Sequence, residues 1–161
     1  MDEIETHLKS LGAGNHLDNM KVVRSFPNHY LLSLEKEEFM DLIFLQSHEV
    51  AKIVPSETDR RLRVVAQHAR GLSAIESRLS GNWNILANLS RLQKSILHDL
   101  ALPLPAFLLR DVRGSESCWS NGWYLQDGSH RALAYCMMIL AGEVNYRCQL
   151  AFCATSKTFP S

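Results

Sequence analysis

Two side chains that can act on a phosphate stand side by side in the segment Asp127-Gly128-Ser129-His130-Arg131. An arginine guanidinium can hold a phosphate through two parallel hydrogen bonds. A histidine titrates near neutral pH, so His130 is a candidate proton donor or acceptor. These two residue types indicate a site that binds an anion.

The residues around this pair predict the element that would position them. Trp123-Tyr124-Leu125 is apolar and aromatic, as a buried strand is, and Asp127-Gly128 is a turn dipeptide. Ser129 is a favoured N-cap residue for the helix that follows. The backbone N–H groups of the first helical turn and the positive end of the helix dipole would then face a ligand, so the segment predicts a phosphate site.

The same residues have simpler alternative roles. Asp127 can cap the turn through its own backbone, and His130 can be a satisfied polar residue at the edge of the core. An arginine at the positive end of a helix dipole is unfavourable by about 0.3–1 kcal/mol, and a bound anion would remove this conflict.

The second half of the chain alternates strands with one helix. Ala106–Leu109 follows Pro103 and Pro105 and is predicted to be a buried strand. The helix Ser129–Ala141 is apolar on nearly every side, so we expect it to be largely buried, and Gly142 ends it. Tyr146–Phe152 is predicted to be the last strand.

The first half is predicted to be mostly helical, which gives an α+β class of small mixed sheet with packed helices. Apolar residues at steps of three and four predict a helix over 84–100. Further predictions are a short helix over 1–12, a strand over 49–54, a helix opening at 56–59 and running to Gly71, and a strand or hairpin over 21–26 or 30–34.

Composition excludes several classes of protein. The 17 basic residues equal the 17 acidic ones in number, so no global charge attracts nucleic acid. The apolar runs are too short for a membrane span and the start of the chain is acidic, which predicts a cytoplasmic protein. The length predicts a single domain, 1–161. The spacing of Cys118, Cys136, Cys148 and Cys153 predicts neither a zinc site nor disulfides; the last three are expected to be buried thiols.

A basic cluster, Arg60-Arg61-x-Arg63, precedes the apolar positions of the predicted helix. It could contact a DNA backbone, or it could be one solvated face that pairs with Glu57 and Asp59. Similarly, Trp119 and Trp123 could stack on a base, although a tryptophan within a strand is more often part of the core.

The order of predicted elements, with Pro-Ser-Glu57 at a helix start and Asp127-Gly-x-His-Arg131 after a strand, resembles the ParB/sulfiredoxin superfamily. The resemblance covers roughly 44–155, with 72–101 as an inserted helical hairpin and 1–43 as an N-terminal elaboration. It implies a ParB/sulfiredoxin-like fold within a single domain.

The resemblance also implies roles for individual residues. Gly128, Ser129, His130 and Arg131 would bind nucleotide phosphates, which agrees with the chemistry of the residues themselves. Glu57 matches the position of a catalytic acid and Asp127 that of an aspartate in the serine-kinase members, and such a carboxylate pair would hold Mg²⁺ or act as a general base. Glu57 could instead stabilise a helix dipole. Sulfiredoxins have a cysteine in the place of Ser129, so sulfinic acid repair is not expected.

The chain is closest in kind to small plasmid-encoded proteins of conjugation inhibition (fertility inhibition) and oncogenic suppression, which have ATPase and DNase activity. The resemblance therefore implies a hydrolase that uses ATP or another nucleoside triphosphate with Mg²⁺ and that acts on the nucleotide, on DNA or on both. Two alternatives remain: a non-catalytic inhibitor that binds a protein of a DNA-transfer or partition complex through 72–101, and a small-molecule kinase of the serine type.

Overall fold

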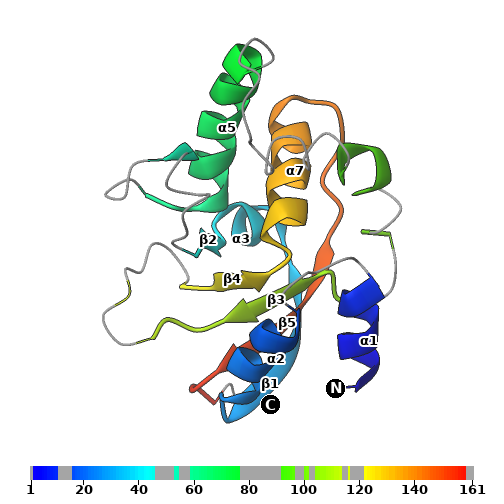
Figure 1. The fold of residues 1–161 in the computed structure, drawn as a ribbon, viewed down its shortest axis with the longest axis vertical. Coiled ribbons are helices and arrows are strands. Elements are labelled where there is room, and N and C mark those ends of the chain that lie inside the picture. The colour runs from blue at the N-terminus through cyan, green and yellow to red at the C-terminus, as the bar shows by residue number, and fades with distance from the viewer. Residues whose placement is uncertain are drawn as a thin grey trace.

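A five-stranded mixed sheet forms the centre of the computed structural model (Figure 1). The structure describes residues 2–10, 16–45, 53–54, 59–76, 92–96, 100–101, 104–113, 116 and 122–158. The strands are β1 (Asn28–Leu34), β2 (Ile43–Phe44), β3 (Phe107–Arg110), β4 (Tyr124–Asp127) and β5 (Gln149–Thr155). The helices include α1 (Asp2–Ser10), α2 (His16–Arg24), α3 (Lys36–Met40), α5 (Leu62–Glu76) and α7 (Ser129–Leu140). The predicted α+β class is confirmed.

The strand order β1-β5-β3-β4-β2 places β4 in the interior of the sheet. β5 pairs antiparallel with β1 and parallel with β3. β4 pairs antiparallel with β3 and parallel with β2, and the β3–β4 register shifts between Leu108 and Leu109. The chain leaves the sheet at Asp127, which lies opposite Leu108, and enters α7 at once.

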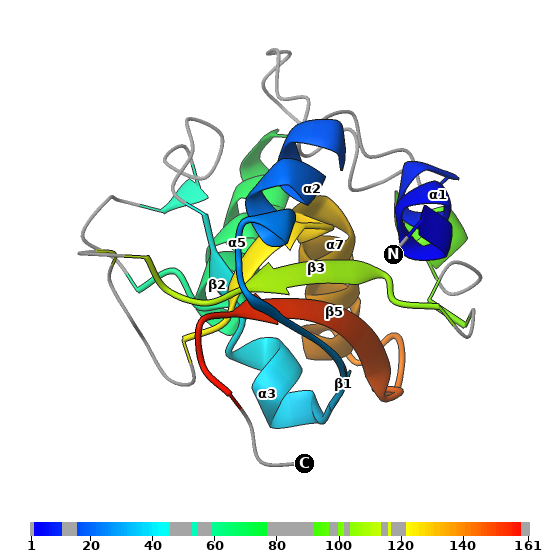
Figure 2. The same ribbon diagram turned by 90° about the horizontal axis from the view of Figure 1, so that it is seen from below.

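The two faces of the sheet carry different layers. Leu125 of β4 and Leu109 of β3 belong to the large core cluster that includes residues of α3, α5 and α7. On the opposite face, Leu108 and Phe152 pack against Met20 and Val23 of α2. Figure 2 shows this arrangement, with α2 on one side of β3 and β5 and α3 on the other.

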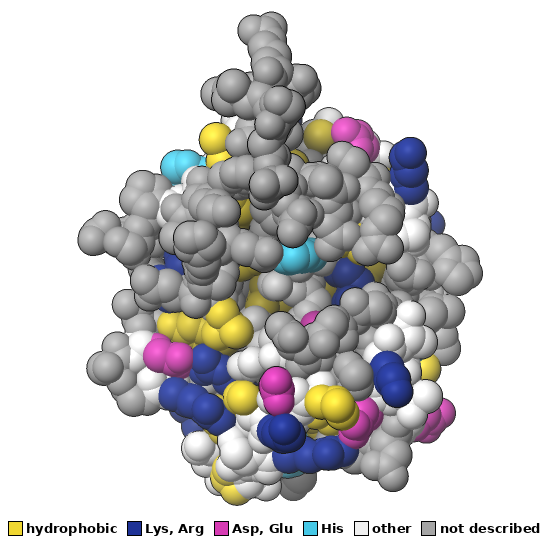
Figure 3. Space-filling view, in the orientation of Figure 1, with side chains coloured by type: hydrophobic (Ala, Val, Ile, Leu, Met, Phe, Trp, Pro, Cys, Tyr) yellow, Lys and Arg dark blue, Asp and Glu magenta, His cyan; other side chains and the backbone are white. Residues whose placement is uncertain are grey.

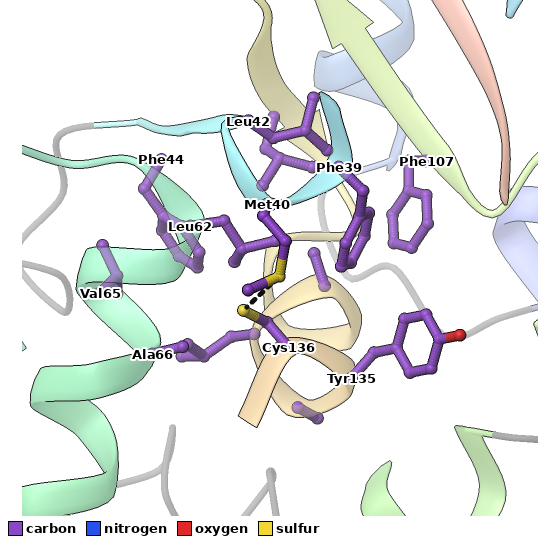
Figure 4. Packing of buried hydrophobic residues seen from close by; sticks show 14 of the residues in the cluster. Phe39, Met40, Leu42, Phe44, Leu62, Val65, Ala66, Phe107, Tyr135 and Cys136 are labelled. Carbon is purple, nitrogen blue, oxygen red and sulfur yellow. Dashed lines mark hydrogen bonds between the residues drawn. The ribbon is translucent and has the colours of Figure 1, made fainter. Parts of the chain in front are cut away.

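The large core is closed by side chains from α3, α5 and α7 (Figure 4). Phe39 makes an edge contact with the Tyr135 ring at a centroid distance of 5.5 Å. The Cys136 thiol lies 3.3 Å from the Met40 sulfur. Every residue of α7 from Arg131 to Met138 is buried, which confirms the prediction of a helix that is apolar on nearly every side.

Several of the predicted helix and strand boundaries differ from the observed ones, for reasons of tertiary structure. Of the two segments predicted as a strand or hairpin, 30–34 is confirmed because it lies within β1, whereas 21–26 is not a strand because 21–24 completes α2. There the spacing of Met20 and Val23 buries both on the sheet, while Asn28–Leu34 forms the strand instead. α5 begins at Leu62, after the predicted opening at 56–59, of which only Asp59 is described; Arg61 forms an antiparallel bridge with Ile43 just before the helix.

The last strand begins at Gln149 and not at Tyr146. The Tyr146 hydroxyl donates to the Leu34 carbonyl oxygen at 2.5 Å, so this residue packs beside the end of β1. Of the 49–54 prediction, Ile53 and Val54 are described and lie in a helical turn and a bend, not in a strand. Most of 84–100 and of the insert 72–101 lies outside the described residues.

Three cysteines are described as free thiols. Cys136 and Cys153 are buried, as predicted, but Cys148 is exposed because it precedes β5. Among the described residues, no helix combines the length and the apolar composition needed to cross a bilayer.

Candidate functional site

The predicted strand, turn and helix form one sharp corner, which we call the Asp127 corner: Asp127, Gly128 and the first turn of α7. Gly128 is the N-cap residue and has a left-handed backbone with φ of 86°. Its carbonyl oxygen accepts the first helical hydrogen bond, from the Ala132 N–H at 2.8 Å. The prediction that Ser129 is the N-cap is therefore wrong. The turn needs a positive φ at the capping position, and glycine adopts that conformation without steric cost.

Gly128 is also required by its surroundings. A Cβ atom at this position would lie 2.9 Å from the Ala106 carbonyl oxygen and 2.9 Å from Cδ1 of Phe107. It would lie 3.1 Å from Nη2 of Arg131. Protein atoms therefore fill the side of the corner that faces Ala106 and Phe107.

Arg131 is buried, with 5% of its surface exposed. Its Nη2 donates to the Ala106 carbonyl oxygen at 2.8 Å. The side chain thus connects the first turn of α7 to the residue that precedes β3. The guanidinium charge is held next to Gly128.

Asp127 is buried as well, with 8% of its surface exposed. Its Oδ1 accepts a hydrogen bond from the Gly128 N–H at 2.6 Å, so the carboxylate caps the turn through the adjacent backbone. Its Oδ2 is buried and has no hydrogen-bond partner among the described residues. A buried carboxylate oxygen without a partner is costly, and the cost disappears when a cation or a proton donor binds there.

Of the other predicted site residues, the structure describes Ser129 and His130 but not Glu57. Ser129 and His130 begin α7 and are half-buried. Glu57 lies outside the described residues, so its distance from Asp127 is not described. Within the described part of the chain, no group of three or more His, Cys, Asp or Glu side chains is arranged to hold a metal ion.

The basic cluster before α5 is paired with acidic side chains. Arg61 Nε lies 2.6 Å from Asp59 Oδ2, and Arg63 Nε lies 2.7 Å from Asp41 Oδ1. Arg60 Nε donates to the Phe44 carbonyl oxygen at 3.1 Å. Figure 3 likewise shows basic side chains interspersed with acidic ones where side chains are described. These contacts favour the alternative in which the cluster is structural.

A polar cluster around Arg110 was not predicted. This buried guanidinium makes two 2.8 Å hydrogen bonds to the Glu116 carboxylate. It also donates to Gln126 at 2.8 Å and lies over the Tyr124 ring. The hydrogen bonds from Arg110 lower the pKa of Glu116. The signal in the sequence is an arginine at the end of the apolar run Phe107–Leu109, which must find a partner when the strand is buried.

The Asp127 corner therefore combines a carboxylate, a guanidinium and the positive end of a helix in one partly closed place. This combination can bind a cation and an anion together. Comparison of the chain with protein-family models, with curated proteins and with solved structures finds no match.

Proposed function

We propose that the chain is a nucleotide-phosphate-handling enzyme of the ParB/sulfiredoxin type, which hydrolyses ATP or another nucleoside triphosphate, cleaves DNA with a divalent metal, or does both. The site is the Asp127 corner. The observation that carries the proposal is the buried Asp127 Oδ2, which has no hydrogen-bond partner among the described residues and lies at the start of α7.

The first step of the argument concerns the cation. A buried polar atom without a hydrogen bond costs about 1–3 kcal/mol, and more when it is charged. Mg²⁺ prefers carboxylate oxygens, so Asp127 fits a metal ligand. Glu57 is the proposed second ligand. When bound, the metal neutralises charge on a phosphate and activates a water or a leaving group.

The second step concerns the phosphate. The first N–H groups of α7 have no carbonyl acceptor within the helix, and they carry the positive end of its dipole. Arg131 adds a full positive charge beside Gly128. Since Ala106 and Phe107 fill the other side of Gly128, the phosphate would lie over Ser129 and His130. His130 would then donate a proton to the leaving oxygen.

A second candidate function is supported by two hydrogen bonds of the same corner. Asp127 Oδ1 accepts from the Gly128 N–H, and Arg131 Nη2 donates to the Ala106 carbonyl oxygen. Both side chains therefore stabilise the corner without a ligand. In this alternative the chain is a non-catalytic inhibitor that binds a protein of a DNA-transfer or partition complex.

Hydrolysis by the purified protein distinguishes the two candidates. ATP, CTP and plasmid DNA are each incubated with and without Mg²⁺, using the wild type, Asp127→Asn and Arg131→Ala. Removing one such electrostatic contact costs about 10²–10³ in rate, so both variants should lose nearly all activity. Asp18→Asn is the matched control, because this aspartate lies on α2 with 79% of its side chain exposed.

Activity that Asp127→Asn and Arg131→Ala leave unchanged would come from a contaminating enzyme, and the binding candidate would then be preferred. A parallel reaction in which free serine replaces DNA tests the kinase alternative through the appearance of phosphoserine. Circular dichroism of each variant shows whether the fold is retained.

A further inference from the structure

The strand β4 contains a β-bulge directly before the Asp127 corner. In the pairing of β3 with β4, Leu109 lies opposite Leu125 and Leu108 lies opposite Asp127. Two neighbouring residues of β3 thus lie opposite residues of β4 that are two positions apart, so Gln126 is the extra residue of the bulge. Bulges of this kind redirect a side chain and are frequent next to active sites.

The bulge determines the side of the sheet on which Asp127 is paired. Residues two apart in a regular strand share a side, so Asp127 would share the side of Leu125, which belongs to the large core. The observed partner is Leu108, which packs on the other side of the sheet, against Met20 of α2. A strand without the extra residue would therefore direct this carboxylate towards the apolar core.

The side chain of Gln126 is held at both ends of its amide. Arg110 Nε donates to Gln126 Oε1 at 2.8 Å, and Gln126 Nε2 donates to Asn19 Oδ1 of α2 at 2.8 Å. The extra residue is thereby tied to β3 on one side and to α2 on the other. In Figure 1, β4 lies beside β3 and leads into α7, the helix of the Asp127 corner.

Arg110, the partner of Gln126 on β3, is itself fixed. It is buried and makes two 2.8 Å hydrogen bonds to the Glu116 carboxylate. Its guanidinium carbon lies 4.9 Å from the centroid of the Tyr124 ring, on the same strand as Gln126. Bidentate pairing with a carboxylate fixes the plane of a guanidinium, so Arg110 Nε is a rigid donor for the Gln126 amide.

We propose that Gln126 is a positioning residue for Asp127: its amide fixes the bulge, and the bulge holds the Asp127 carboxylate at the start of α7. There Oδ1 accepts from the Gly128 N–H at 2.6 Å, and Oδ2 is the atom that would bind the cation. This role rests on the proposed function. Gln126 would act on the cation site through the backbone it shares with Asp127, without being a ligand itself.

Titration with Mn²⁺ alone, followed by electron paramagnetic resonance of the free ion, tests this role. Gln126→Met removes both amide hydrogen bonds and keeps the length of the side chain. Its Kd for Mn²⁺ should rise at least about tenfold, since loss of a group that supports a metal ligand costs about 10–100-fold in affinity. Thr155→Val is the matched control, with an unchanged Kd, because it removes a buried side chain's hydrogen bond to Asp111 Oδ2 from β5, which pairs with β1 and β3.

The amide proton of Gly128 gives a second readout, which reports the position of Asp127 directly. A short hydrogen bond to a carboxylate shifts an amide proton signal downfield, so in Gln126→Met the Gly128 signal should move upfield. Asn19→Ala removes only the bond to α2 and should produce both effects to a smaller extent. This milder variant also tests the role if Gln126→Met does not fold.

The outcomes separate the role of Gln126 from the proposed function. A wild type that does not bind Mn²⁺ overturns both together. Where the wild type binds, a Gln126→Met variant that binds as tightly and keeps its Gly128 signal overturns the role of Gln126 alone. Equal weakening of Mn²⁺ binding by Gln126→Met and Thr155→Val also overturns it, because the affinity would then follow the general stability of the sheet.

Discussion

At the scale of single residues, Gly128 determines the geometry of the Asp127 corner. Gly128→Ala should lower the free energy of unfolding by about 1–3 kcal/mol, because the alanine meets both an unfavourable backbone conformation and a filled space. The positive φ of 86° gives the first term, and the 2.9 Å approaches to Ala106 and Phe107 give the second. Urea denaturation measures the sum.

Two other glycines separate these terms. Gly142 has a φ of +72° but no atom within 4 Å of an added Cβ, so Gly142→Ala should show the backbone cost alone, about 1–2 kcal/mol. Gly71 lies inside α5 with open space, and Gly71→Ala should raise the free energy of unfolding by about 1 kcal/mol. Equal costs at Gly128 and Gly142 would show that the corner can relax around a methyl group.

The sequence predicts part of this corner and leaves part of it open. The Asp-Gly turn and the following helix could be predicted, because each is a local pattern of neighbouring residues. The role of Ser129 was predicted wrongly, since the αL conformation of Gly128 moves the cap by one residue. The bond from Arg131 to Ala106 joins residues far apart in the chain, so no local pattern contains it.

At the scale of elements, α2 can be tested through its buried face. Met20→Ala should lower the free energy of unfolding by about 2–5 kcal/mol, since Met20 is 1% exposed against Leu108 and Phe152. Leu17→Ala, on the same helix, should change it by less than about 0.5 kcal/mol. Chemical denaturation of both variants measures the difference. Similar values for the two would contradict the packing of α2 on the sheet.

The elements that could be predicted closely are those that the rest of the protein covers on nearly every side. β3 and α7 are continuous apolar segments, and both were predicted close to their observed bounds. The end of α2 belongs to 21–26, one of two segments predicted as a strand, where Val22 and Val23 favour extended structure locally. The sheet provides an apolar surface that a helix with Met20 and Val23 on one face can cover, and this tertiary contact prevails over the local preference.

At the scale of the whole molecule, buried thiol and phenol groups make the fold sensitive to alkaline pH. Burial raises the pKa of Cys136 from 9.0 to about 12, and it also raises the pKa of Tyr146 and Cys153. Because each folded-state pKa is above the unfolded value, the unfolded chain loses these protons first. The contribution of these protonated groups to the free energy of unfolding is therefore fully present below about pH 9. It falls as the pH rises towards 12.

Urea midpoints measured from neutral pH to about pH 11 check this prediction. Each buried thiol should contribute a fall of at most about 1.4 kcal/mol per pH unit. Cys136→Ala should reduce the fall, whereas Cys148→Ser, at an exposed position, should leave it unchanged. A free energy of unfolding that stays constant through this range would contradict the burial of these groups.

The order of the strands in the sheet is also a property of the whole molecule. No local pattern in the sequence predicts which strands pair or which lie at the edges. The N-terminal segment contributes β1, which lies beside β5 at the edge of the sheet. That pairing joins Asn28 to Thr155, at opposite ends of the chain. Pairings at this separation follow from the fold of the whole molecule.

The central claim, that the Asp127 corner binds the phosphates of a nucleotide with a divalent cation, is tested most directly by NMR titration of ¹⁵N-labelled protein. ATP with Mg²⁺ should shift the amide signals of Gly128, Ser129, His130 and Arg131, and Mn²⁺ in place of Mg²⁺ should broaden them. In Asp127→Asn the Mn²⁺ broadening should disappear. Signals of these amides that stay unchanged at saturating ATP and Mg²⁺ would contradict the claim.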